Sequence, residues 1–443
     1  MRTVRIGAGS GFSGDRIEPA VELAERGGLA YLVFECLAER TIALAQLARL
    51  RDPEGGYDPL LAARMRAVLP ACRREGVRIV TNMGAANPLA AARRVAAVAR
   101  ELGLRGLRVA AVTGDDVTEA LRGTGTALDD GGTVAALGNR LVSANAYLGA
   151  PPIAAALAAG AEVVVTGRVA DPALFLGPLI HEFGWARDDW TRLGRGTVVG
   201  HLLECAGQVT GGYFADPGYA DVPDLARLGF PLAEVTEDGN AVITKVPGSG
   251  GRVTPATCKE QLLYEVHDPA RYLQPDVVAD FTGVRVAAAG EDAVRVTGGD
   301  GAPRTGTLKV SVGCHEGWFG EGGISYAGPG AVARGRLALD LVRERLRLTG
   351  HAAEELRFDL VGMDAILGPH AGAPEAREVR VRVIGRCASP EAAARIGREV
   401  DSLYLNGPAS GGGVTTAVRE VIGIRSCLVP EAGVTPNLAW VEA

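Results

Sequence analysis

The first half of the chain alternates short apolar segments with Ala-, Leu- and Arg-rich helical segments, and this alternation constrains the fold more than any other feature. Strands separated by helices are typical of a parallel sheet with helices on both faces. The sequence therefore predicts an α/β protein. We expect strands at 4–8, 31–34, 77–81, 107–112, 141–144 and 162–166, and the clearest helices at 59–75 and 88–102.

Each predicted strand ends in small or polar residues. In parallel α/β sheets the ligand crevice lies at these carboxyl ends. A single such end is an ordinary turn, but recurrence at six ends favours a binding site. The polar residues concerned are Ser10, Glu35, Asn82, Asp115, Asn145 and Arg168, with Asp171 in the turn after Arg168.

The length of 443 residues and the hydrophobic content of 47% allow two sizeable cores. After Asp216 strands and turns dominate, so we place a boundary near Pro223. The prediction is a parallel α/β domain over 1–222 and an α+β domain with glycine-rich loops over 223–443. We expect the site between the two domains.

The charge pattern argues against nucleic acid or an anionic membrane as partner, because the net charge is -6 and no Lys/Arg run is present. No apolar run approaches the length of a membrane span, and no signal core follows Met1. The seven cysteines show no CxxC spacing, which fits a reducing cytoplasm. We expect a cytoplasmic homo-oligomer that acts on a small molecule.

The segment 200–212 has helical spacing, and its last three residues, Thr210, Gly211 and Gly212, form a stop signal. His201, Glu204, Cys205 and Gln208 fall at i, i+3, i+4 and i+7, so they would share one stripe. A solvated helix face is the alternative, but such faces carry Lys, Arg or several Glu rather than His with Cys. We therefore interpret the stripe as a site.

Two glycine loops are further binding candidates. Gly9, Gly11 and Gly14 spell GxGxxG after a strand, with Glu35 ending the next one, in the outline of a dinucleotide-binding motif. Asp15 argues against it, since a carboxylate would stand where pyrophosphate needs bare amides. The alternative is a tight turn with Asp15 as helix N-cap.

The second loop contains Gly248, Gly250 and Gly251 and precedes a helix that Thr254 caps with Pro255 at its first position. Backbone amides at a helix start can bind phosphate, and Lys245 and Arg252 flank the loop. A structural turn is the alternative.

The C-terminal part reads as strands at 357–366 and 378–386, a helix at 390–403 and a glycine run at 407–413, which predicts an α+β subdomain. Isolated histidines are more often structural than catalytic, so they rank below His201. These lower-ranked residues are His181, Glu182, His315, Glu316 and His370.

Segments spread over nearly the whole chain carry a resemblance to a known family: GSGFSGDR (9–16), FECLAERT (34–41), TGRVADPALFLGPLIHEFGW (166–185), GHLLECAGQVTGG (200–212), ITKVPGSGG (243–251), EQLLYEVHDPARYLQPDV (260–277) and SYAGPG (325–330). With them the chain resembles the acyclic terpene utilisation proteins of the AtuA type. The resemblance implies catabolism of branched, isoprenoid-derived acyl-CoA compounds. Many relatives also carry a small ferredoxin-like domain with an RSGDKG-type sequence, which is either absent here or supplied by a separate polypeptide.

These features together favour an enzyme, and we hypothesise a lyase that hydrates or dehydrates a branched unsaturated acyl-CoA or related carboxylate. Glu204 would be the acid/base and His201 its partner, while Arg168, near Asp171, and the amides of 210–212 would stabilise the anion. One alternative is thioester hydrolysis or transfer with Cys205 as nucleophile. Another is a non-catalytic subunit that binds acyl-CoA through the glycine loops. The sequence is also compatible with a divalent metal ion bound by His201 and Glu204.

Overall fold

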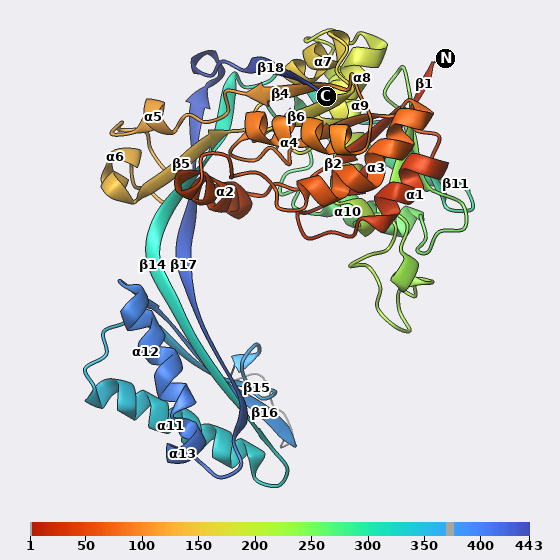
Figure 1. Cartoon of the computed structure of the whole chain (residues 1–443). Coiled ribbons are helices and arrows are strands. Elements are labelled where there is room, and N and C mark those ends of the chain that lie inside the picture. Colours follow the sequence, from red (N-terminus) through yellow and green to blue (C-terminus); the bar gives the residue numbers. More distant parts are fainter. Residues whose placement is uncertain (1, 369–375) are drawn as a thin grey trace. The chain divides into compact units, whose positions relative to one another are not determined.

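The computed structural model describes residues 2–368 and 376–443, which form two compact units (Figure 1). One unit comprises the chain up to Gly313 together with Ile424–Ala443, and the other comprises Cys314–Gly423. This division differs from the expected boundary near Pro223. Residues 223–313 belong to the first unit because the strand at Pro231–Thr236 pairs with the first strand of the chain.

The first unit is built on a ten-stranded sheet whose five central strands run parallel in the order β1-β2-β3-β6-β4. The α/β prediction is confirmed. Val163, Val164 and Val165, on the strand between β3 and β4, are all buried, as expected for strands covered on both faces. The parallel strands are β1 (Thr3–Ser10), β2 (Tyr31–Phe34), β3 (Arg78–Thr81), β6 (Val163–Thr166) and β4 (Arg108–Thr113).

Antiparallel strands extend this sheet on both sides. The predicted strand at 141–144 exists as β5 (Leu141–Ala146) but lies outside the parallel sheet, because it pairs with β14 (Thr307–Ala327). A separate small sheet has the order β13-β10-β9. The added strands are β7 (Pro231–Thr236), β8 (Ala241–Lys245), β12 (Ala293–Thr297), β11 (Arg285–Gly290) and β18 (Asn437–Glu442); the small sheet contains β13 (Asp300–Ala302), β10 (Val278–Asp280) and β9 (Tyr272–Leu273).

Helices cover both faces of the large sheet (Figure 1): α1, α3 and α4 pack on one face, and α7, α8 and α9 on the other. The helices predicted at 59–75 and 88–102 are confirmed as α3 and α4 within two residues. The helices of this unit are α1 (Glu18–Arg26), α2 (Glu39–Arg51), α3 (Leu61–Glu75), α4 (Pro88–Glu101), α5 (Thr118–Leu121), α6 (Val134–Leu137), α7 (Pro151–Ala158), α8 (Ala173–Phe183), α9 (Trp190–Glu204) and α10 (Pro255–Leu263).

The second unit is a sheet of order β15-β16-β14-β17 packed against α11 and α12. The glycine-rich part of β14 serves this packing, since a Cβ at Gly320 would lie 1.9 Å from the Ala393 carbonyl oxygen of α12. The elements that complete it are β15 (Glu355–Val361), β16 (Glu378–Cys387), β17 (Gly412–Pro430), α11 (Ala331–Leu348), α12 (Pro390–Asp401) and α13 (Leu403–Asn406).

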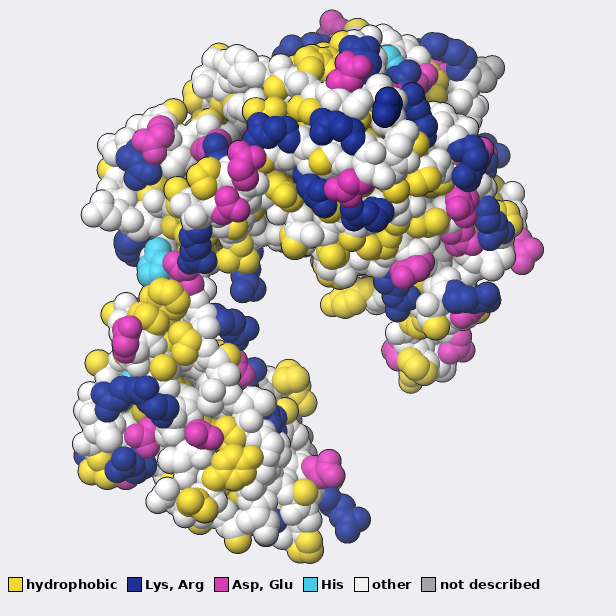
Figure 2. All heavy atoms as spheres, viewed as in Figure 1, with side chains coloured by type: hydrophobic (Ala, Val, Ile, Leu, Met, Phe, Trp, Pro, Cys, Tyr) yellow, Lys and Arg dark blue, Asp and Glu magenta, His cyan; other side chains and the backbone are white. Residues whose placement is uncertain are grey.

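Acidic and basic side chains are interspersed over the visible face of each unit (Figure 2). Among the described residues, no helix is both long and apolar enough to cross a membrane.

Candidate functional site

Helix α9 delivers the first functional pair at its carboxyl end. Asp189 caps the helix start, and the helix ends at Glu204 rather than continuing to 209. Ala206 has φ +41° and begins a separate 3₁₀ turn, Ala206–Gln208. The expected four-residue stripe is therefore wrong. Cys205 and Gln208 leave the helix, and only His201 and Glu204 keep their i, i+3 relation.

His201 and Glu204 form a buried pair in which His201 Nδ1 lies 2.8 Å from Glu204 Oε1. Neither His201 Nε2 nor Glu204 Oε2 has a hydrogen-bond partner within the described ranges. The rings of Tyr272 and Phe281 lie 5.4 Å and 5.6 Å from the imidazole centre. Burial raises the pKa of Glu204 to about 7, against the lowering effect of His201, and the charge of Asp171 adds to the rise.

Arg168, in the turn after β6, is a second centre of the site. Its guanidinium is buried, donates to the carbonyl oxygens of Val169 and Leu37, and forms an ion pair with Asp171. The guanidinium also lies over the Tyr147 ring, 4.1 Å from its centre. Although burial lowers the pKa of this arginine, Asp171, Tyr147 and Glu35 raise it, so Arg168 stays charged.

Glu35, just past β2, faces this arginine. Its Oε1 accepts from the Leu37 amide at 2.7 Å and from Asn82 Nδ2 at 2.9 Å. Burial and the charge of Asp171 raise the pKa of Glu35 to about 8, although Arg168 acts in the opposite direction. Asp171 raises the pKa of both Glu35 and Glu204, so the structure brings these three carboxyl groups, predicted separately, within electrostatic range of one another.

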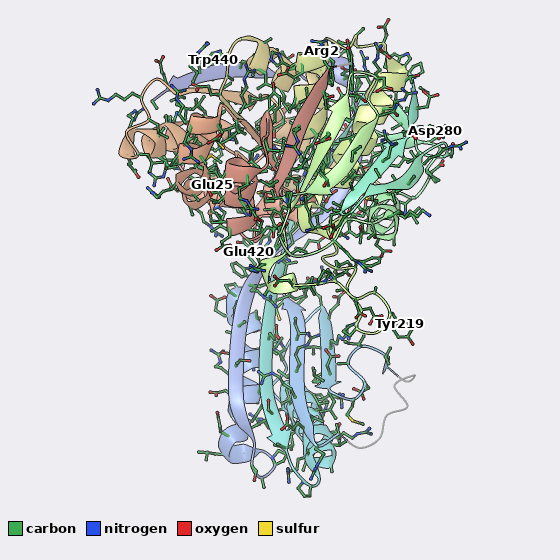
Figure 3. All side chains as sticks on the ribbon, turned by 90° about the vertical axis from the view of Figure 1, so that its right-hand side faces the viewer. Arg2, Glu25, Tyr219, Asp280, Glu420 and Trp440 are labelled. Carbon is green, nitrogen blue, oxygen red and sulfur yellow. The ribbon has the colours of Figure 1, made fainter. Side chains whose placement is uncertain are left out.

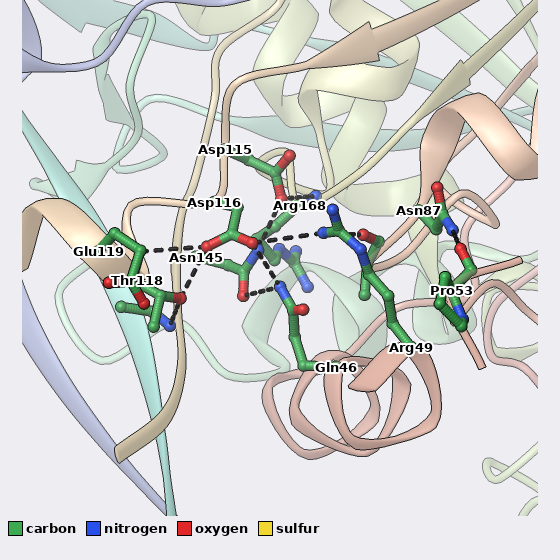
Figure 4. A network of polar contacts seen from close by, with 12 residues as sticks. Gln46, Arg49, Pro53, Asn87, Asp115, Asp116, Thr118, Glu119, Asn145 and Arg168 are labelled. Carbon is green, nitrogen blue, oxygen red and sulfur yellow. Dashed lines mark hydrogen bonds and ion pairs between the residues drawn. The ribbon is translucent and has the colours of Figure 1, made fainter. Parts of the chain in front are cut away.

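Asp115 holds the site together rather than facing a ligand. Its Oδ2 accepts from the Arg168 backbone amide and from Asn145 Nδ2, both at 2.9 Å (Figure 4). Burial raises the pKa of Asp115 to about 6. Ser10 has a similar structural part, since its hydroxyl donates to the Glu35 carbonyl at 2.9 Å. Both residues fix neighbouring turns, and the expectation that they bind substrate stays a prediction.

A cavity of about 640 Å³ is lined by Cys205, the residue that follows Glu204 in the chain. It is formed by the loop after β1, the turn after α9 and the segment 225–230. Gly11 is required here, because a Cβ would lie 2.5 Å from the Cys205 carbonyl carbon. The lining residues are Gly11, Phe12, Gly14, Asp15, Arg16, Cys205, Gly207, Gln208, Gly212, Tyr213, Leu225, Leu228, Phe230 and Tyr264.

The GxGxxG loop has no bare amide for a pyrophosphate at Gly11. Asp15 Oδ2 accepts from the Gly11 amide at 2.9 Å, and its Oδ1 accepts from the Arg16 amide. Helix α1 starts at Glu18 with Ile17 at its N-cap, so the expected capping by Asp15 is also wrong. A Cβ at Gly9 would lie 2.7 Å from the Phe34 ring, so this glycine serves packing.

The second glycine loop is closed by internal contacts. The amides of Gly250, Gly251 and Arg252 donate to carbonyl oxygens of Arg227, Pro223 and Thr210. Lys245 donates to the Ser249 carbonyl and pairs with Asp292 at 3.0 Å, and Gly248 sits in the turn with φ +83°. Phosphate binding would require these contacts to break, so we leave the loop out of the proposed site. The expected cap of α10 by Thr254 and Pro255 is confirmed.

The turn 210–212 is also committed internally. The amides of Gly211 and Gly212 donate to the Gln208 and Gly207 carbonyl groups, and the Thr210 hydroxyl donates to the Gly229 carbonyl at 2.7 Å. The amides of Gly211 and Gly212 are therefore not placed to stabilise an anion, and the expectation for the Thr210 amide stays a prediction.

The thiol at Cys205 is the one cysteine side chain within the described ranges that is not fully buried, and all seven cysteines are free. Burial and the nearby charge of Glu204 raise its pKa, which opposes formation of a thiolate. Within residues 2–368 and 376–443 no group of three or more His, Cys, Asp or Glu side chains is arranged to hold a metal ion.

The lower-ranked polar residues lie elsewhere. His181 contacts Arg78 at 3.0 Å, and Glu182 accepts from the Tyr31 hydroxyl at 2.6 Å. In the second unit His315 lies 3.5 Å from Glu420, and Glu316 accepts from the Cys314 thiol. His370 is outside the described residues.

Arg64 of α3 is an important residue that the sequence argument missed. It is fully buried, pairs with Asp58 at 3.6 Å, and donates to the carbonyl oxygens of Phe12, Ser13 and Asp15. It therefore fixes the loop that walls the cavity. The sequence does carry a signal for this role, because Arg64 lies on the apolar helix stripe that includes Leu61, Met65 and Val68.

The family model described as "Acyclic terpene utilisation family protein AtuA" matches residues 4–440, nearly the whole chain. A search of curated proteins finds no match.

Proposed function

The chain belongs to the acyclic terpene utilisation family, which fits a role in isoprenoid catabolism, and we propose that it is a hydro-lyase acting on a branched unsaturated acyl-CoA or related carboxylate. The observation that carries the proposal is the buried Glu204–His201 pair, whose carboxyl has a pKa of about 7. A group with its pKa near the working pH is suited to accept and return a proton.

Hydration of a conjugated acyl compound needs a base for water and an acid for the α-carbon. Ionised Glu204 would take a proton from water as the water oxygen bonds to the β-carbon, and His201 would hold the carboxylate in place. The pKa of Glu35, about 8, leaves this carboxyl largely protonated at neutral pH, so Glu35 would supply the α-proton. Dehydration runs the same steps in reverse.

Arg168 has an electrostatic part in this proposal. Its buried positive charge, paired with Asp171, offsets negative charge that develops on the substrate carbonyl in a site of low dielectric. Its guanidinium donates to protein oxygens, so we assign Arg168 to positioning and to electrostatic stabilisation rather than to proton transfer.

The test is Glu204→Gln, which keeps size and hydrogen bonding but removes the proton-transfer group. We expect normal folding, similar substrate binding, and a loss of kcat of about 10² to 10⁴-fold. Rates would be measured on 3-methyl-branched 2-enoyl-CoA compounds, and binding by calorimetry. A folded variant with wild-type turnover would remove Glu204 from the mechanism.

Thioester hydrolysis or transfer through Cys205 is the second candidate, favoured by the position of this thiol at the cavity. Its raised pKa counts against it. Cys205→Ser separates the two: the hydro-lyase keeps most of its rate, whereas a thioesterase loses it. If the wild type binds such compounds tightly but turns none over, the protein is a binding subunit.

A further inference from the structure

We propose that the cavity beside Cys205 binds the hydrocarbon chain of an acyl ligand, as a subsite separate from the carboxyl groups that would perform the chemistry. The direction of the chain, with its carbonyl end toward Glu204, rests on the proposed function. The existence of the subsite rests on the cavity wall alone.

The size and lining of the cavity fit an apolar chain. Its volume of about 640 Å³ lies within the range of small-molecule sites, and most of its side-chain wall is apolar or aromatic. Phe12, Leu225, Leu228, Phe230 and Tyr264 provide this wall.

The charged side chains at the cavity hold its wall together. Asp15 accepts from the amides of Gly11 and Arg16, and the Arg16 guanidinium donates to the carbonyl oxygens of Leu225 and Ala226 at 3.0 Å and 3.1 Å. These contacts join the loop after β1 to the segment at 225–226. An apolar ligand would therefore enter without having to displace an ion pair across the cavity.

Glycines leave room for the apolar side chains of the wall. A Cβ at Gly207 would lie 2.9 Å from Leu228 Cδ2, and a Cβ at Gly14 would lie 2.7 Å from the Phe12 ring. Arg64 fixes the same loop from behind through its three carbonyl contacts. The wall is thus defined by packing and hydrogen bonds on both sides.

The rim of the cavity exposes aromatic surface that a bound chain would cover. Phe12 is 59% exposed and Tyr213 is 90% exposed, and both line the cavity. Tyr219 lies on the same segment, where Figure 3 shows it on the outside of its loop. Removing such surface from water favours an apolar ligand.

The experiment measures binding against chain length by calorimetry, using CoA thioesters and free acids of increasing 3-methyl-branched chain. We expect wild-type affinity to rise about fourfold per added methylene until the cavity is filled. Leu228→Trp fills the cavity and should remove most of this rise. Leu50→Trp, on an exposed site of α2, is the matched control and should behave as wild type.

A wild type without chain-length dependence, or a Leu228→Trp protein with the wild-type slope, would overturn the proposal. If Leu228→Trp fails to fold, Phe12→Ala replaces it, since its exposed side chain can be cut without loss of core, and the slope should fall by at least half. Protection of Cys205 from maleimide by long but not short chains locates the ligand, with Cys205→Ser identifying the labelled thiol.

The two proposals fail separately. If Leu228→Trp reduces the chain-length slope and Glu204→Gln keeps full turnover, the subsite is supported and the hydro-lyase is contradicted. A Glu204→Gln protein that loses turnover while Leu228→Trp leaves the slope intact supports the hydro-lyase and contradicts the subsite.

Discussion

The first unit buries two groups of carboxylates with raised pKa values, and the groups differ in their partners. In one, repulsion by Asp171 adds to burial at Glu35 and Glu204, and Glu204 Oε2 has no hydrogen-bond partner among the described residues. In the other, Asp115 and Asp276 accept backbone amides, and burial raises the pKa of each to about 6.

This difference shows that a raised pKa alone does not identify a catalytic group. Burial raises the pKa in both groups. Asp276 accepts the amide of Ala150 before α7 and so fixes a turn. Glu204 instead pairs with the His201 side chain, and its buried Oε2 has no hydrogen-bond partner among the described residues, so this oxygen can exchange a proton with a ligand.

The largest expected effect is the contrast between Glu204→Gln and Asp115→Asn, which make the same change from carboxylate to amide. Both contacts of Asp115 go to one oxygen, so an asparagine oxygen can keep them, and turnover should stay within about threefold of wild type. Glu204→Gln should be about 10² to 10⁴-fold slower. Equal kcat losses in the two variants would abolish the distinction.

Next in size is Arg168→Met, which removes the cation that the first group shares. The change leaves the buried Glu35 and the partly exposed Asp171 without their countercharge. We expect about 3 kcal/mol less unfolding free energy in denaturant titrations, the lower end of the range for buried pairs, because Asp171 is 37% exposed. Arg122→Met is the control, because its ion pair with Glu119 is exposed and should be worth at most about 1 kcal/mol. Similar losses in both would contradict the role given to Arg168.

The pH dependence of stability should reveal Glu35. Its pKa of about 8 in the folded chain exceeds the ordinary value of 4.5, so the native state binds the proton more tightly. Wild-type stability should therefore fall as pH rises from about 4.5 to 8, by up to a few kcal/mol, and Glu35→Gln should flatten this slope.

Glu39→Gln serves as the control of opposite sign. Burial raises the pKa of Glu39, but hydrogen bonds from Lys309 and Tyr147 outweigh this effect and lower the pKa to about 2. Its stabilising contribution is present above about 4.5 and is lost as pH falls through 2, so this variant should leave the slope above pH 5 unchanged. Parallel pH profiles of wild type and Glu35→Gln would contradict the assignment of Glu35.

The smallest effect is that of Asp115→Ala, which removes the acceptor for the Arg168 amide and for the Asn145 side chain. The unpaired Arg168 amide and Asn145 side chain should cost about 1–3 kcal/mol of unfolding free energy. Thermal unfolding of Asp115→Asn beside Asp115→Ala measures this, and a stable Asp115→Ala would show that the turn needs no acceptor.

Local patterns in the sequence were sufficient for several elements. Val163–Thr166 is buried and strand-forming by composition, and helix α10 carries its cap in Thr254 and Pro255. The His201–Glu204 contact also follows from local spacing, since residues three apart share a helix face. Such features depend on neighbours within one turn or one strand.

Several of the expectations that were wrong concerned partners distant in the sequence. The segment at 141–146 forms a strand as expected, but its pairing with β14 depends on residues more than 150 positions later. The glycine loop at 248–251 was expected to offer its amides to a phosphate, but carbonyl groups of Arg227, Pro223 and Thr210 take up the amides of residues 250–252. Nothing in a local pattern states which acceptor a backbone amide will find.

The sequence by itself determined the parallel strands, their polar ends and the His201–Glu204 spacing, because each arises from short-range backbone geometry. Only the tertiary structure decided that Asp171 lies close enough to raise the pKa of both Glu35 and Glu204, and that Arg64 crosses from α3 to fix the Phe12 loop. Electrostatic and packing effects of this kind depend on distance in space, and chain folding alone sets that distance.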